Sequence, residues 1–147
     1  MVSYLYMLLV TVVLILGTVL SKEKLDFFQT AAYHNKVHMY YDYLYSVIES
    51  VKGNESIYCG DSSCASGKEI SLSGYSTDNK VRICKASDGS FYAFYPSINL
   101  TSKPFVSLSD TDYAVVSATS VPSICGSLHS DDSFALCYST ASNGCQE

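Results

Sequence analysis

The N-terminal half of the chain shows two successive helical patterns. Residues 2–20 contain no charged side chain, and a helix of that length would be about 28 Å long, close to the hydrocarbon thickness of a bilayer. Residues 25–51 contain neither Pro nor Gly, and their apolar positions recur at spacings typical of an amphipathic helix. This helix is predicted to end at Lys52-Gly53-Asn54, with Gly53 in the left-handed conformation that often follows a helix. The repeating positions are Tyr33, Val37, Tyr40, Leu44, Val47 and Val51.

After Gly53 the period of the pattern changes to two. Short alternating runs are separated by Ser, Gly, Asn and Asp, which is typical of antiparallel strands joined by turns. The clearest hairpin joins 80–84 to 91–95 through Asp88-Gly89, a strong turn signal. The predicted fold is therefore α+β, with a long N-terminal helix packed on a small antiparallel β-sheet that carries disulfides. The other predicted strands are 69–73, 105–108, 113–118 and 134–138.

These patterns divide the chain into an apolar signal or anchor segment (1–21), an amphipathic helix (22–53) and a disulfide-bearing antiparallel β domain (54–147). The apolar run is longer than the roughly 7–15 residues of a signal-peptide core, and no Ala-x-Ala motif follows it. We favour an uncleaved transmembrane anchor, with a cleaved signal peptide as the alternative. Lys22 and Lys24 directly after the run would favour a cytoplasmic side, but the cysteines described next place that side outside.

Cysteine usage indicates a protein that is secreted or exposed outside the cytosol. All six cysteines follow residue 58 in a short chain, and behind an export segment this predicts a disulfide framework. The sequence does not select among the possible pairings. Two Asn-x-Ser/Thr sequons, at Asn54 and Asn99, are candidate glycosylation sites of an extracellular glycoprotein. The disulfide candidates are Cys59, Cys64, Cys84, Cys125, Cys137 and Cys145.

Charge argues against nucleic acid as a partner. The net charge is −5 and the only arginine is Arg82, whereas phosphate binding needs clustered Lys and Arg. No small-molecule substrate is inferred either. The expected partner is another protein or a second copy of the chain, together with a membrane through residues 2–20 if these remain uncleaved.

No pattern points to a catalytic or metal centre. Cys59 and Cys64 have four intervening residues, whereas a redox pair or zinc knuckle usually has two; they form a local disulfide loop or are each linked elsewhere. His34, His38 and Asp42 share one helical face, but no Glu stands between the histidines to act as a base. We interpret this face as a solvated polar stripe. We therefore expect no enzyme, no metal and no cofactor.

Serine-based catalysis has equally little support. No Gly-x-Ser-x-Gly elbow occurs. His129 stands near Asp131 and Asp132, which could imitate a His-Asp pair, but the surrounding residues have the composition of a surface loop.

Aromatic residues are the remaining candidates for a contact surface. Residues 91–95 alternate across both faces of the predicted sheet, so one face packs on the helix and the other is either covered by the chain or exposed. The tyrosines of 40–45 point to more than one face of the helix. The contact-surface candidates are Tyr92, Phe94, Tyr41 and Tyr45.

An apolar helical segment, an amphipathic helix and a small disulfide-bearing sheet in this order resemble a type IV pilin or pseudopilin. In that family the apolar half-helix anchors the subunit in the membrane and then packs in the filament core, and a C-terminal disulfide loop often closes the sheet. Here Cys125, Cys137 and Cys145 are the candidates for that loop. The resemblance concerns the layout of the whole chain, since no Gly marks a prepilin cleavage point and Leu5 stands where the family has Glu.

The resemblance implies a non-catalytic, membrane-tethered extracytoplasmic protein that acts through protein–protein contacts, with a pilin-like filament subunit as its most specific form. The alternative is a freely secreted, disulfide-stabilised binding module or effector from which the apolar segment has been removed.

Overall fold

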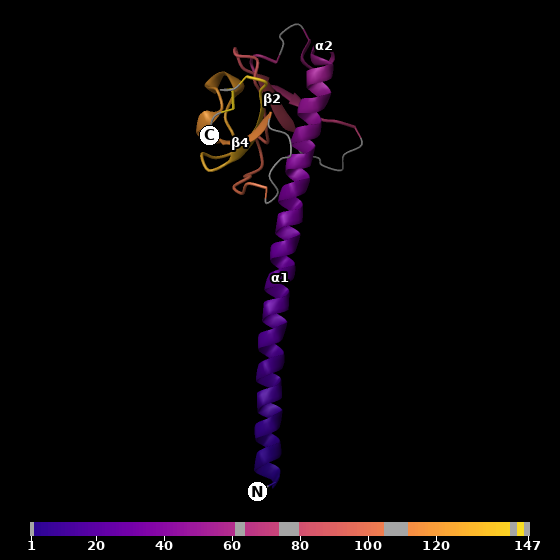
Figure 1. Cartoon of the computed structure of the whole chain (residues 1–147), viewed down its shortest axis with the longest axis vertical. Helices are drawn as coiled ribbons and strands as arrows, with labels where there is room; N and C mark the ends of the chain where they lie inside the picture. The colour runs from indigo at the N-terminus through magenta and orange to yellow at the C-terminus, as the bar shows by residue number, and fades with distance from the viewer. Residues whose placement is uncertain (1, 61–63, 74–79, 105–111, 142–143, 146–147) are drawn as a thin grey trace. The chain divides into compact units, whose positions relative to one another are not determined.

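The computed structural model describes residues 2–60, 64–73, 80–104, 112–141 and 144–145, with the backbone alone at 2, 3, 5, 17, 19–23, 25 and 27. The chain divides into two compact units, Met1–Lys36 and Val37–Glu147, called here the first and second units. Helix α1 (Val2–Gly53) contributes residues to both (Figure 1).

The helix predicted over 25–51 is confirmed, but its end differs from the prediction. Gly53 is the last residue of α1, and it is not among the described residues with a positive φ. The chain turns at Asn54, whose carbonyl accepts a hydrogen bond from the Ile57 amide at 3.0 Å and so begins the short helix α2 (Glu55–Cys59). The left-handed glycine occurs one helix later, at Gly60 (φ 64°). A helix of five residues is too short to show a helical period in the sequence, so α2 was not predicted.

Among the described residues, five strands form one antiparallel sheet in the order β1-β2-β3-β5-β4. The predictions for 80–84, 91–95, 113–118 and 134–138 are confirmed to within one residue at either end. Of the strand predicted over 69–73, only residues 69 and 70 lie in a strand, which begins at Lys68. The prediction for 105–108 lies outside the described residues. The strands are β1 (Lys68–Ile70), β2 (Val81–Lys85), β3 (Phe91–Phe94), β4 (Tyr113–Ser117) and β5 (Phe134–Tyr138).

The Asp-Gly turn between β2 and β3 is confirmed. The Ala86 amide donates to the Ser90 carbonyl at 2.8 Å, and the Gly89 amide donates to the Ala86 carbonyl at 3.0 Å. The Asp88 carboxylate accepts from the Ser90 amide at 2.9 Å, as Asp commonly does in turns. Gly89 has a φ of 88°, which a residue with a Cβ would adopt only with strain.

One face of the sheet packs against the part of α1 that belongs to the second unit (Figure 1). Leu44, Val47 and Ile48 are completely buried there, at the spacing that one side of a helix presents. This packing of a long helix on a five-stranded antiparallel sheet confirms the predicted α+β fold. The sheet residues in this cluster are Ile70, Val81, Ile83, Phe91, Ala93, Tyr113 and Leu136.

The opposite face of the sheet, called here the second face, is covered by irregular segments of the same unit. Tyr92 and Phe94 of β3 are buried in a separate apolar cluster with Val121 and Leu128. Two short 3₁₀ helices, η2 (Ala118–Ser120) and η3 (Ser123–Cys125), lie in the segment that supplies this cover. Because the two clusters take alternate residues of β3, all four residues of that strand are buried.

Candidate functional site

All six cysteines are paired in three disulfides, which confirms the predicted framework. The Cα–Cα distances of 5.0, 5.3 and 5.8 Å fall in the usual range for disulfides. Three disulfides in a small domain indicate an oxidising, extracytoplasmic location. The pairs are Cys59–Cys64, Cys84–Cys125 and Cys137–Cys145.

Two of the disulfides hold the cover of the second face in place. Cys84 of β2 is bonded to Cys125 of η3, and Cys137 of β5 is bonded to Cys145 eight residues later. All four cysteines belong to the apolar cluster of that face. The irregular segments are therefore linked covalently to two strands of the sheet.

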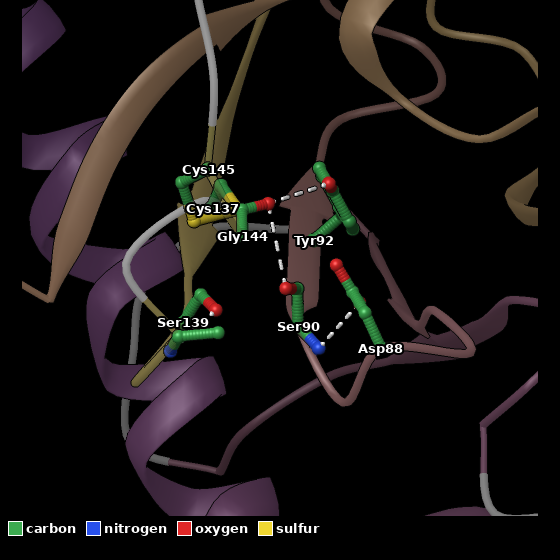
Figure 2. Close-up of a disulfide and its surroundings, with 8 residues drawn as sticks. Asp88, Ser90, Tyr92, Cys137, Ser139, Gly144 and Cys145 are labelled. Carbon is green, nitrogen blue, oxygen red and sulfur yellow. Dashed lines mark hydrogen bonds between the residues drawn. A yellow bond between two sulfur atoms is a disulfide. The ribbon is translucent and has the colours of Figure 1, made fainter.

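Figure 2 shows how the Cys137–Cys145 loop is attached to the hairpin of β2 and β3. The Gly144 carbonyl accepts hydrogen bonds from the Ser90 hydroxyl at 3.4 Å and the Tyr92 hydroxyl at 3.3 Å. Burial and the charge of Asp88 raise the pKa of Tyr92, so its phenol keeps the proton that it donates. A Cβ at position 144 would overlap the Ser139 side chain, so only glycine fits this close approach.

A second polar cluster fixes the last turns of α1 to the sheet. The Glu49 carboxylate accepts hydrogen bonds from the Tyr113 hydroxyl and from Lys52 Nζ, the latter at 2.6 Å. Lys52 Nζ also lies 4.0 Å from the centre of the Tyr138 ring, a cation–π distance. The cluster therefore joins the end of α1 to β4 and β5.

The charges within this cluster shift its pKa values. The hydrogen bonds from Lys52 and Tyr113 lower the pKa of Glu49. Burial alone would lower the pKa of Lys52, but its hydrogen bond to Glu49 and the charge of that carboxylate outweigh burial and raise it. Burial and the same carboxylate raise the pKa of Tyr113. At neutral pH the cluster is therefore a stable ion pair with a protonated phenol.

Neither polar cluster was predicted from the sequence. The i,i+3 spacing of Glu49 and Lys52, with a cation in the last turn of a helix, was a signal for a local ion pair. Nothing in the sequence places Tyr113 or Gly144 beside their partners, because each contact joins residues that are distant along the chain.

Three of the four aromatic contact-surface candidates lie inside the chain. Tyr92 and Phe94 are buried under the second face's cover, and Tyr41 is buried between α1 and the sheet. The prediction that these three side chains form an exposed surface is therefore wrong, because the chain covers both faces of its own sheet. Tyr45 is half-buried, with its ring centre 4.7 Å from that of Tyr113.

The candidate metal and catalytic residues lie on the surface. His38 Nδ1 is 2.8 Å from Asp42 Oδ2, and both side chains are more than half exposed. Within the described ranges no group of three or more His, Cys, Asp or Glu side chains has an arrangement suited to a metal ion. His129, Asp131 and Asp132 are exposed, and no hydrogen bond among their described side chains joins them.

The first unit carries most of the large apolar side chains that are exposed among the described residues. Every described side chain of 4–16 is exposed, with Tyr4 79% exposed at one end and Leu16 56% at the other. Among the residues that the structure describes, which leave out several side chains of 2–20, no helix has both the length and the apolar character needed to cross a bilayer. The apolar members of this surface are Tyr4, Tyr6, Met7, Leu8, Leu9, Val10, Val12, Val13, Leu14, Ile15 and Leu16.

No family model, curated protein or solved structure matches the chain. The architecture is therefore defined from the structure alone. Its described parts are a long N-terminal helix, a five-stranded antiparallel sheet packed on the residues of α1 that belong to the second unit, and a disulfide loop at residues 137–145. This layout is pilin-like.

Proposed function

We propose that the chain is a non-catalytic, extracytoplasmic protein that acts through protein–protein contacts. In this proposal it is tethered to a membrane, and assembles with other copies of itself, through the apolar part of α1, as a pilin-like filament subunit does. The observation that carries the proposal is the exposed apolar surface of residues 4–16.

Every described side chain of this surface is exposed. Apolar residues occupy almost every position of 4–16 and therefore all sides of the helix. A helix that is apolar all round is found inside a protein assembly or a bilayer, because water is a poor solvent for it. Burying each Val, Leu or Ile side chain there contributes roughly 1.5–3 kcal/mol.

The polar side chains within the apolar stretch already have partners. The Thr11 hydroxyl donates to the Met7 and Leu8 carbonyls at 3.0 and 2.8 Å, and the Thr18 hydroxyl donates to the Ile15 carbonyl at 2.8 Å. A buried hydroxyl without a partner would cost roughly 1–3 kcal/mol. An apolar partner can therefore cover these threonines at little cost.

Assembly is tested by replacing an exposed aliphatic side chain with asparagine, either on the proposed assembly surface or, as a control, elsewhere on the chain. Leu8→Asn and Leu14→Asn each place an amide on the proposed assembly surface, where the leucines are 56% and 63% exposed. Ile57→Asn is the matched control, since Ile57 is 76% exposed but lies on α2. Losing about 2 kcal/mol per contact raises the assembly concentration roughly 30-fold.

The measurement is sedimentation and electron microscopy of the protein from its native host. Both leucine variants are expected to stay dispersed at concentrations where wild type and Ile57→Asn form particles. A dispersed wild type that retains residues 2–20 would refute self-assembly. Assembly of the leucine variants at wild-type concentrations would refute the role of this surface.

A second candidate, a freely secreted binding module, is favoured by the position of the buried core. The first buried residue among those described is Val37, and the three disulfides also lie after it. Removing an N-terminal signal would therefore leave the second unit's cores complete. N-terminal sequencing distinguishes the candidates: a start at Met1 or Val2 supports the tethered protein, and a start near Lys22 supports the secreted one.

A further inference from the structure

The two sequons have different backbone environments. Asn54 precedes the first turn of α2, and the two residues that complete its sequon are helical. The sequon of residues 99–101 lies in the irregular segment between β3 and β4, outside any helix or strand. Because the typical N-glycan acceptor lies in a surface loop, the structure separates two sites that look alike in sequence.

The Asn99 side chain is held in one orientation. Its carbonyl oxygen Oδ1 accepts hydrogen bonds from the Ser130 and Ser133 hydroxyls, each at 2.9 Å. Ser133 is almost completely buried, whereas Asn99 is exposed. The amide nitrogen Nδ2 is the other branch of the same planar group, so it is directed away from the two serines.

The backbone of this sequon is fixed by its middle residue. Leu100 is buried in the helix-facing core, and its carbonyl accepts a hydrogen bond from the Phe134 amide at 2.9 Å. Asn99 and Thr101, on either side of it, are both exposed. The two residues that a glycosyl transferase must recognise are therefore on the surface of the folded chain.

We propose that Asn99 carries an N-linked glycan and that Asn54 does not. We also propose that Asn99, through its amide oxygen Oδ1, joins the segment of residues 99–101 to the loop that precedes β5. In the transfer step Nδ2 bonds to the anomeric carbon of a lipid-pyrophosphate-linked oligosaccharide. The carbon–oxygen bond to the pyrophosphate breaks, the lipid pyrophosphate leaves, and Nδ2 loses one proton. Oδ1 remains an amide oxygen, so both serine hydrogen bonds survive. The inference rests on export of the second unit and is independent of filament assembly.

The test uses the full chain expressed through the secretory pathway of a eukaryotic cell line, with intact mass measured before and after peptide N-glycosidase treatment. Wild type and Asn54→Gln are expected to carry one N-glycan each. Thr101→Ala and Asn99→Gln are expected to carry none. An unglycosylated Asn99, or a glycan on Asn54, overturns the assignment of the site.

Stability of the non-glycosylated variants tests the second role of Asn99. Thr101→Ala removes the sequon but keeps both hydrogen bonds to Asn99, whereas Asn99→Ala removes the sequon and both bonds. Asn99→Ala is expected to melt about 5 °C or more below Thr101→Ala. Equal melting temperatures would refute the joining role. Self-assembly of the same preparations is scored separately, so failure of the filament proposal and failure of this one are distinguishable.

Discussion

Removing the Cys84–Cys125 disulfide should destabilise the chain more than removing either of the others. The bond joins residues 41 positions apart, against 8 for Cys137–Cys145 and 5 for Cys59–Cys64. A cross-link restricts the unfolded chain more strongly as the loop it closes grows. The chain-entropy relation gives about 4 kcal/mol for the longest loop, about 2.5 for the middle one and about 2 for the shortest.

Packing should further increase the loss of stability for Cys84–Cys125 relative to the other two disulfides. Cys84 and Cys125 are both completely buried in the cluster of the second face, so replacing both by alanine also leaves unfilled space. Lost contacts around buried atoms add to the entropic effect. We therefore expect the loss for Cys84→Ala/Cys125→Ala to be at least the entropic 4 kcal/mol or so.

The assay is equilibrium urea unfolding of the three paired Cys→Ala variants under non-reducing conditions. Peptide mapping first confirms that the two remaining disulfides of each variant are native. Free energies of unfolding are compared only where the dependence on urea is similar, because a changed slope signals a changed unfolded state. A loss for the Cys137–Cys145 pair equal to or larger than that for Cys84–Cys125 would refute the reasoning from loop length.

Three further substitutions test individual contacts. Glu49→Gln should flatten the dependence of stability on pH: the folded-state pKa of Glu49 is lowered, so its contribution is present above the unfolded-state value near 4.5 and is lost as pH falls through the folded-state value. Its side chain is 38% exposed, so the effect should stay below about 1 kcal/mol in urea unfolding between pH 2 and 7. Gly144→Ala should cost about 1–3 kcal/mol in the same assay, because its Cβ would overlap Ser139. Tyr43→Phe should cost about 1–2 kcal/mol, because the Leu72 amide loses the hydroxyl that accepts its hydrogen bond at 2.9 Å.

The Gly144 and Tyr43 substitutions each have a matched control. Gly53→Ala should be neutral or slightly stabilising, since no atom lies within 4 Å of its added Cβ. Tyr4→Phe, at a highly exposed tyrosine, should leave stability unchanged. A Glu49→Gln variant with the pH profile of wild type, a Gly144→Ala variant as stable as wild type, or equal effects of the two Tyr→Phe changes would each contradict the corresponding contact.

The helix and the strands could be predicted because their patterns are local. The 3.6-residue period of 25–51 and the Asp-Gly turn at 88–89 both act over a few residues, and the structure follows them closely. The first and last residues of four of the strands were also predicted to within one residue. Local steric and hydrophobic preferences are sufficient for these elements.

The cover of the second face could not be predicted from such patterns. Tyr92 and Phe94 were candidates for an exposed surface because their own strand does not reveal what lies above them. The segment that buries them begins after β4, and it is held there by disulfide partners that sequence alone cannot pair. The same applies to Gly144, whose role depends on Ser90 and Tyr92 more than fifty residues earlier.

The different covers of the two sheet faces have a consequence for how the chain can diversify. On the helix face, the position of α1 on the sheet depends on the mutual fit of large side chains, so most substitutions there disturb the neighbouring side chains. On the second face, two covalent bonds fix the irregular segments in addition to their packing. Loops retained in this way can change length and surface chemistry while the sheet beneath them stays the same. The second face is thus the part of the molecule on which new recognition properties can arise at the lowest structural cost.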